Sequence, residues 1–203
     1  DIFYIGVKSE DQMGAEFSFF ARFFPPPPGG GDPDEPILLE GFAVPIPDGT
    51  PQQPDGNEVF FFNPNMRDVR RVTVTNLSIT HQLMGDLVAE LFIDNGPIDE
   101  IPRATVLNHR GDDARNGITY IFDDSEEGNV IYPSANPTLP LHPYYDLGGP
   151  ATRSDGPRTL DSLVGQDGSG LWQFTFSDNQ SNHIGSVDAV SLWVEPVVED
   201  DPF

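Results

Sequence analysis

The sequence predicts an all-β protein in which about eight short strands build a β-sandwich, most simply a jelly roll. Several segments alternate apolar and polar residues with a period of two, which is typical of strands with one buried face. The 21 prolines and 20 glycines separate these segments with turns, and the 15 phenylalanines supply bulk for a core. No segment has the apolar pattern of a helix longer than two turns.

The chain begins with two aromatic, strand-like segments, 2–9 and 15–24, that a turn joins. They predict an N-terminal β-hairpin over residues 1–24. Because a lone hairpin is marginally stable in water, it must pack on something. It covers the sheet of the main domain, remains from a preceding domain, or donates a strand to a neighbouring molecule. Residues 25–36, with four successive prolines and then three glycines, form a spacer.

The main domain is expected over residues 37–196, and an acidic tail follows at 197–203. Its first apolar runs, 37–46 and 59–62, read as short strands. Proline and glycine dominate the stretch between them, so we expect a loop there that extends through Gly56.

The longest strand region is 72–93, with the sequence VTVTNLSITHQLMGDLVAELFI. Its first half alternates β-branched and polar residues, as a half-buried strand does. The apolar side changes phase between Val74 and Leu77, which predicts a β-bulge. In the segment 86–93, two leucines four residues apart also fit one helical turn, so periodicity alone leaves strand and helix open.

Later strands are expected at 104–107, 118–122, 171–177 and 190–194. Polar or proline-rich loops are expected at 94–103, 108–117, 123–128 and 133–157. The alternation places Trp172 and Phe174 on one strand face, and Leu192 and Val194 on one face of the last strand. We expect these four side chains inside the sandwich and the acids outside. Trp193 is expected to fill the core as well.

Charge and composition exclude several classes of partner. The formal net charge is −23, because 33 acidic residues face only 10 lysines and arginines. Such a surface repels phosphate backbones and anionic lipid, so we expect neither nucleic-acid nor membrane-surface binding. No apolar run reaches the ~18–20 residues of a membrane span. The lack of cysteine is compatible with secretion, and processing from a longer precursor explains a first residue, Asp1, other than methionine.

Five segments carry a resemblance to a known family: VPIPDG (44–49), VTVTNLSITHQLMGDLVAELFI (72–93), ATVLNHRG (104–111), GITYIFDD (117–124) and GLWQFTFSDNQSNHIGSVDAVSLWV (170–194). In this order they resemble the P domain, or P/Homo B domain, of proprotein convertases and bacterial subtilisin-like proteases. The resemblance covers residues 37–195 and departs from the family in longer inserts at 94–103 and 133–165.

The resemblance implies a non-catalytic sandwich with a jelly-roll, galactose-binding-like topology, and it implies that the segment 86–93 is a strand. P domains follow protease domains and stabilise them, and they also occur without a protease in large bacterial exported or surface proteins. An extracellular or cell-surface location is therefore expected for this chain.

Clustered acids make calcium the candidate cofactor. The two loops that flank the strand at 118–122 contain Asp112, Asp113, Asp123, Asp124 and Glu126. Ca²⁺ binds six to eight oxygen ligands, and a bound ion would relieve the repulsion among these carboxylates. Asp86, which precedes a strand, is a separate candidate ligand. The alternative is a solvated acidic surface, or adaptation to a saline habitat.

The histidines do not predict catalysis. His81 is expected to be a partly buried structural residue that bonds to the backbone or to Asp86. The others, His109, His142 and His183, lie in separate loops without metal-ligand spacing and are expected at the surface. The chain has neither a cysteine nor a Gly-x-Ser-x-Gly elbow to supply a nucleophile, so an enzyme is not expected.

The expected function is that of a non-catalytic, exported structural or accessory module. In one version it is a subunit of an extracellular surface assembly, which self-associates with its protein partners through the strands in residues 1–24. The alternative is a carbohydrate- or protein-binding module attached to, or processed from, a secreted hydrolase. In that alternative, Tyr144 and Tyr145, with Trp172 or Trp193, form a platform for a sugar.

Overall fold

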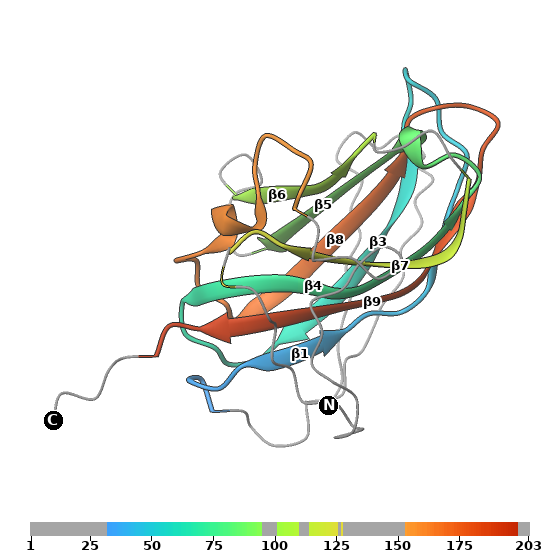
Figure 1. Ribbon diagram of the computed structural model, residues 1–203. Coiled ribbons are helices and arrows are strands. Elements are labelled where there is room, and N and C mark those ends of the chain that lie inside the picture. The colour runs from blue at the N-terminus through green and yellow to red at the C-terminus, as the bar shows by residue number, and fades with distance from the viewer. Residues whose placement is uncertain (1–31, 95–100, 110–113, 126, 128–152, 199–203) are drawn as a thin grey trace, which may run out of the picture.

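Two antiparallel β-sheets pack face to face in the computed structural model of the chain (Figure 1). The structure describes residues 32–94, 101–109, 114–125, 127 and 153–198. The predicted hairpin at 1–24, most of the spacer and most of the loop at 133–157 lie outside these residues. The predicted all-β sandwich is confirmed, and the jelly-roll connectivity stays a prediction.

The first sheet has the order β1-β9-β4-β7, with β2 also paired to β9. Its strands are β1 (Ile37–Glu40), β2 (Val44–Ile46), β4 (Val69–His81), β7 (Arg115–Asp123) and β9 (Gly185–Pro196). The second sheet has the order β3-β8-β5-β6. Its strands are β3 (Asp55–Asn63), β5 (Leu87–Asp94), β6 (Arg103–Asn108) and β8 (Gly170–Asp178). Within the described ranges, two 3-10 helices, η1 (Met84–Asp86) and η3 (Leu160–Leu163), lie in connections between strands.

Strand β4 lies inside the first sheet, because it pairs with β9 on one side and with β7 on the other. The β4–β7 register shifts between Val74 and Leu77, where the sequence predicts a bulge. The irregularity lets both side chains face the core, and each is fully buried. The predicted bulge is therefore confirmed.

The segment 86–93 forms a strand rather than a helical turn. Strand β5 pairs with β6 and with β8 along its length. Its residues Leu87, Ala89, Leu91 and Ile93 are all buried in the core, which is the period-two pattern of a sheet. Helix η1 completes the turn between β4 and β5, so the chain is already extended at Leu87.

The core between the sheets contains the side chains that the sequence places there. Trp172, Phe174, Leu192 and Val194 are each 0% exposed. The indole N–H of Trp172 donates to the carbonyl oxygen of Gly168 at 3.0 Å, so the polar edge of this large ring is satisfied in the interior.

The prediction that Trp193 fills this core is wrong. In the registers of the first sheet, Trp193 lies level with Thr73 and, one strand further, Asp123. Successive strand residues point to opposite faces, so a residue beside the inward Leu192 must lie on the outer face. The ring is nevertheless buried, and its indole N–H donates to a carboxylate oxygen of Glu195 at 3.2 Å.

Several strand boundaries differ from the sequence prediction. Strand β3 begins at Asp55, inside the predicted loop, because residues 55–58 continue the ladder with β8. Gly56 permits this, since a Cβ there would lie 2.0 Å from the carbonyl oxygen of Phe176. Strand β7 begins at Arg115, inside the predicted polar turn at 108–117. Pairing with a neighbouring strand outweighs local turn propensity in both places.

The segment after residue 153 covers the edge of the second sheet at β6. The backbone N–H of Thr105 donates to the carbonyl oxygen of Arg158 at 2.9 Å, and the N–H of Gly156 donates back to Thr105 at 3.1 Å. The chain then enters η3, where Leu160 and Leu163 are buried in the core. This helix closes one end of the sandwich, and η1 lies at the opposite end (Figure 1).

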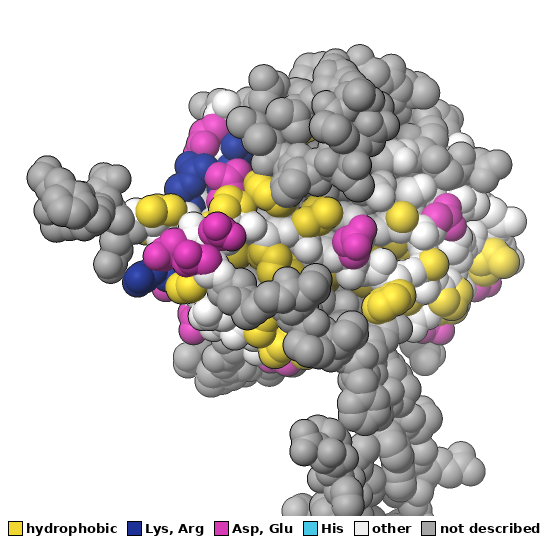
Figure 2. Space-filling view, turned by 90° about the horizontal axis from the view of Figure 1, so that it is seen from below, with side chains coloured by type: hydrophobic (Ala, Val, Ile, Leu, Met, Phe, Trp, Pro, Cys, Tyr) yellow, Lys and Arg dark blue, Asp and Glu magenta, His cyan; other side chains and the backbone are white. Residues whose placement is uncertain are grey.

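Some large hydrophobic side chains stay exposed in the described part: Phe42, Phe62, Val164, Ile184, Val197 and Val198. Figure 2 shows one face of the molecule, where exposed hydrophobic groups alternate with acidic ones. Basic and acidic side chains interleave at the left edge of this view. Scattered apolar side chains of this kind are common on soluble proteins and do not by themselves mark a binding site.

Candidate functional site

Four carboxylates lie inside the part of the protein that the structure describes, which corrects the expectation that the acids stay outside. Asp86, Asp123, Asp124 and Asp178 are each less than a tenth exposed. A buried carboxylate is costly unless it is paired or hydrogen-bonded, so each one needs a partner. The partners divide these residues among three polar centres, two near η3 and one near η1.

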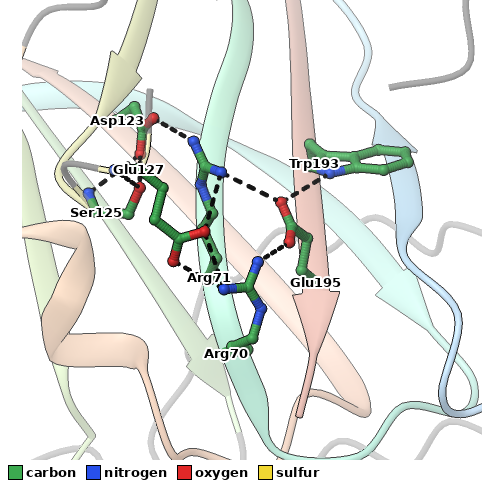
Figure 3. A network of polar contacts seen from close by, with 7 residues as sticks. All are labelled: Arg70, Arg71, Asp123, Ser125, Glu127, Trp193 and Glu195. Carbon is green, nitrogen blue, oxygen red and sulfur yellow. Dashed lines mark hydrogen bonds and ion pairs between the residues drawn. The ribbon is translucent and has the colours of Figure 1, made fainter. Parts of the chain in front are cut away.

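The first centre is a network of ion pairs on the outer face of the first sheet, here called the arginine network (Figure 3). Its members come from β4, β9, and the end of β7 with the residues that follow it: Arg70, Arg71, Asp123, Ser125, Glu127, Trp193 and Glu195. Arg71, whose side chain is only 4% exposed, contacts Asp123 at 2.5 Å between Nη2 and Oδ2. It also lies 3.5 Å from Glu127 and 3.7 Å from Glu195.

Arg70 joins the two outer carboxylates of the arginine network. Its Nη1 donates to Glu127 at 2.7 Å, and its Nη2 pairs with Glu195. The hydrogen bonds that Arg70 donates, first to Glu127 and second to Glu195, raise its pKa above the ordinary value. The network thus holds permanent charges in fixed geometry across three strands, which suits a structural clamp rather than proton transfer.

The second centre is the carboxylate of Asp124, which follows β7. It accepts hydrogen bonds from the Ser154 backbone N–H at 3.0 Å, the Ser154 hydroxyl at 2.6 Å and the Leu160 N–H at 2.8 Å. Asp123 and Asp124 are adjacent in sequence but use separate partners. Asp124 therefore fastens the segment that covers β6 and leads into η3.

The third centre, here called the histidine cluster, lies at the opposite end and contains His81, Asp178, Asp86, His183 and Asp48. His81 is buried, and its Nδ1 lies 2.8 Å from the Leu83 carbonyl oxygen. The predicted bond of His81 to the backbone is thus confirmed. Its carboxylate partner is Asp178 at 3.3 Å, rather than the predicted Asp86.

Asp86 instead pairs with His183, whose Nδ1 lies 2.7 Å from the Asp86 carboxylate. The side chain of His183 is 34% exposed, so it lies partly at the surface, and it is paired with a buried carboxylate there. The backbone N–H of His183 donates to Asp48 at 3.3 Å. His109 is exposed, as predicted, and its Nδ1 lies 2.7 Å from the carbonyl oxygen of Gly85.

Burial raises the pKa of Asp178 above its ordinary value. The N–H of Gln180, which donates to Asp178 at 2.8 Å, and the nearby His81 act in the opposite direction. The negative charges of Asp86 and Asp48 add to the effect of burial. Loss of hydration is the dominant cause, because the carboxylate is fully buried.

The structure does not bring the described candidate calcium ligands together. Asp123 pairs with Thr73 in the β4–β7 register, whereas Asp86 follows the far end of β4 at His81. Eight residues of strand separate Thr73 from His81, a span of roughly 26 Å. No group of three or more acidic or histidine side chains within the described ranges is arranged to hold a metal ion.

Calcium binding stays a prediction, because Asp112, Asp113 and Glu126 lie outside the described residues. His142, Tyr144 and Tyr145 lie outside them as well. If the predicted acids bind calcium, EDTA lowers the melting temperature by several degrees and added Ca²⁺ restores it, since an ion bound only by the folded state stabilises that state. Magnesium should restore less. An unchanged melting temperature in EDTA contradicts the prediction.

The burial of Asp178 could have been predicted from the sequence. Asp178 follows Trp172, Phe174 and Phe176 at intervals of two, so the strand phase points it into the core. His81, which is expected to be partly buried, continues the inward phase of β4 in the same way. An ionisable residue in phase with a hydrophobic strand face is therefore a candidate buried group.

The fold and its centres define the class of protein: an antiparallel, two-sheet β-sandwich with charged groups buried at both ends. No family model matches the chain, and no curated protein matches it. Among the described residues, no helix is both long and apolar enough to span a membrane.

Proposed function

We propose that this chain is a non-catalytic structural or accessory module of an exported protein, and that copies of it join through their N-terminal strands. The observation that carries the proposal is the edge of β3. The three polar centres support a structural role, because their carboxylates and imidazoles are engaged with other groups of the fold. The resemblance to P domains supports the same role.

Strand β3 differs from the other edge strands of the sandwich. It forms nine consecutive pairs with β8 without a register shift, and among the described residues no strand pairs with its other edge. By contrast, β1 has only four residues, the β4–β7 ladder is irregular, and backbone bonds from 155–158 cover β6. Natural proteins protect long edges with proline, bulges or charged side chains, lysine above all. Strand β3 contains no proline, lysine or bulge, and its only charged residues, Asp55 and Glu58, lie in its first half.

The outer face of β3 presents apolar side chains beside this edge. Phe62 is 43% exposed and Phe60 is half-buried. A strand added to the edge gains main-chain hydrogen bonds, and aromatic side chains on the same face add apolar contacts. The segment 15–24 alternates and is rich in phenylalanine, so it has suitable chemistry for such a strand.

The described chain also begins within reach of β3. The carbonyl oxygen of Pro33 accepts the N–H of Arg67, which follows the last residue of β3 by four positions. Arg67 pairs with Asp34 as well. Residues 25–32, the eight that precede this contact, span up to about 29 Å when extended, and β3 is about 30 Å long. A strand at 15–24 therefore lies within chain reach of a β3 edge, and the mass measurement below distinguishes the edge of the same copy from that of an adjacent one.

Deletion of residues 1–24 is expected to abolish self-association, because it removes the donated strand. Light scattering after size-exclusion chromatography, at several protein concentrations, measures the mass of the full chain and of the deletion variant. A full chain that stays monomeric at all concentrations contradicts the proposal. So does a deletion variant that forms the same assembly.

A substitution on β3 tests the accepting edge separately. Phe62→Glu places a charge beside the edge and is expected to weaken association at least tenfold, which corresponds to about 1.4 kcal/mol. Val164→Glu is the matched control, because Val164 is 42% exposed but lies outside β3. Equal association of both variants and the wild type argues against β3 as the acceptor.

A further inference from the structure

His81 and Asp178 meet where two strand connections leave the same end of the sandwich. His81 is the last residue of β4 and Asp178 is the last residue of β8. Both side chains have 0% exposure. The Nε2 of His81 lies 3.3 Å from Oδ2 of Asp178, and neither atom has a regular hydrogen-bond partner in the described part of the protein. Two buried polar atoms without other partners are satisfied only if a hydrogen lies between them and forms a hydrogen bond.

The other nitrogen of His81 faces two backbone groups of a single residue. Its Nδ1 lies 2.8 Å from the carbonyl oxygen of Leu83 and 3.1 Å from the nitrogen of Leu83. A bare Nδ1 accepts the Leu83 N–H, and a protonated Nδ1 donates to the Leu83 carbonyl. Either protonation state of Nδ1 therefore has a partner, and the backbone need not move between them.

We propose that His81 and Asp178 form a buried proton-binding pair that couples the stability of this end of the sandwich to pH. At high pH, Nε2 carries a hydrogen toward the Asp178 carboxylate while Nδ1 accepts from Leu83. On acidification one proton enters from water and Nδ1–H then donates to the Leu83 carbonyl. The hydrogen between Nε2 and Oδ2 is shared by the pair, whose net charge changes from −1 to zero.

The charges around the pair favour this uptake. Asp86 of η1 and Asp48 of the β2–β3 connection raise the electrostatic cost of a further negative charge at Asp178. Asp55 of β3 lies opposite Asp178 in the strand register, and His183 of the β8–β9 connection pairs with Asp86.

The sign of the pH dependence depends on both groups, because the unfolded chain also binds one proton, on the free imidazole, below about pH 6.5. In the folded chain, burial raises the pKa of the Asp178 carboxyl. Without Asp178 the folded state loses the shared proton while the unfolded state still takes up its own, so acidification should stabilise that variant less than the wild type.

Thermal unfolding of the full chain between about pH 5 and 8 tests the coupling in wild type, Asp178→Asn and Asp188→Asn. Acidification reduces the net negative charge in all three, so the comparison between them isolates the pair. The control is apt because Asp188 is exposed and bonds to the hydroxyls of Thr80 and Ser186. We expect the gain in melting temperature on acidification to be smaller in Asp178→Asn by about 2–4 °C, and unchanged in Asp188→Asn.

Nuclear magnetic resonance of the wild type tests the proposal even if the Asp178→Asn variant does not fold. The ¹⁵N shifts of His81 should report a single Nε2–H tautomer at high pH and protonation of both nitrogens, or rapid exchange with Asp178, on acidification. The ¹³C shift of the Asp178 carboxyl should change over the same range, above the ordinary range for aspartate. An Asp178 carboxyl that titrates in the ordinary range, or equal pH dependence of melting in all three proteins, overturns the proposal.

Discussion

Replacing Arg71 with methionine should lower the free energy of unfolding by about 3–5 kcal/mol, the usual cost of removing one partner from a buried ion pair. The methionine fills much of the volume of the arginine stem but leaves Asp123 without its cation. Asp123 is 9% exposed, so water cannot rehydrate it fully. The bonds that Ser125 donates to Asp123 remain, and they do not neutralise the charge.

Urea denaturation of Arg71→Met and Arg67→Met measures this effect against a matched control. Arg67 also pairs with an aspartate, but its side chain is 43% exposed. Exposed ion pairs contribute about 0–1 kcal/mol, so the control should change little. The double variant Arg71→Met/Asp123→Asn should be more stable than Arg71→Met alone, because it removes the isolated charge. If Arg71→Met costs no more than Arg67→Met, the arginine network does not stabilise the fold.

Strand periodicity predicted the part of the fold in which one face of a strand is fully buried. Trp172 and Phe174 alternate with polar residues, and Leu192 and Val194 alternate with Ser191 and Trp193, so their inward positions follow from the sequence. A change of phase between two such faces also located the bulge in β4. These features depend on neighbours within the same strand, which the sequence displays directly.

Features that depend on distant parts of the chain were not predictable in this way. The prolines and glycines before Val59 predict a loop, so the sequence does not indicate the first residues of β3 as strand. Their extended form comes from pairing with β8, more than a hundred positions later. Trp193 is expected in the core, although its alternation with the inward Leu192 places it on the outer face. Reading the phase of the last strand consistently from Leu192 and Val194 gives the face that the structure shows.

The candidate sites were predictable only as individual acids, not as centres. The sequence shows that the carboxylates are clustered but does not show which residues pair with each of them. A shared ion was therefore the predicted way to offset their charge. In the structure Asp123 takes Arg71 from another strand, and Asp124 takes backbone groups some thirty residues away. Partial burial is expected for His81, and strand phase could have predicted burial of Asp178, but their proximity requires the register of both sheets.

After Arg71, the carboxylate of Asp124 should be the described polar group whose substitution lowers the free energy of unfolding most. Replacement by alanine leaves three donors near a buried position without their acceptor: the Ser154 N–H, the Ser154 hydroxyl and the Leu160 N–H. Only part of them can turn to water, because Leu160 is 1% exposed. We expect Asp124→Ala to lower the free energy of unfolding by about 2–4 kcal/mol.

The loss should be local before it is global, because Asp124 fastens one segment to the sandwich. Hydrogen exchange at Leu160 and at the Thr105 N–H, which bonds to Arg158, should therefore accelerate in Asp124→Ala before exchange in β8 does. Asp167→Ala is the matched control, because this exposed aspartate also accepts a backbone N–H and a hydroxyl, both from Ser169. It should cost less than about 1 kcal/mol, since water replaces exposed bonds. Uniform acceleration across both sheets in Asp124→Ala would mean that the segment after residue 153 unfolds only together with the whole sandwich.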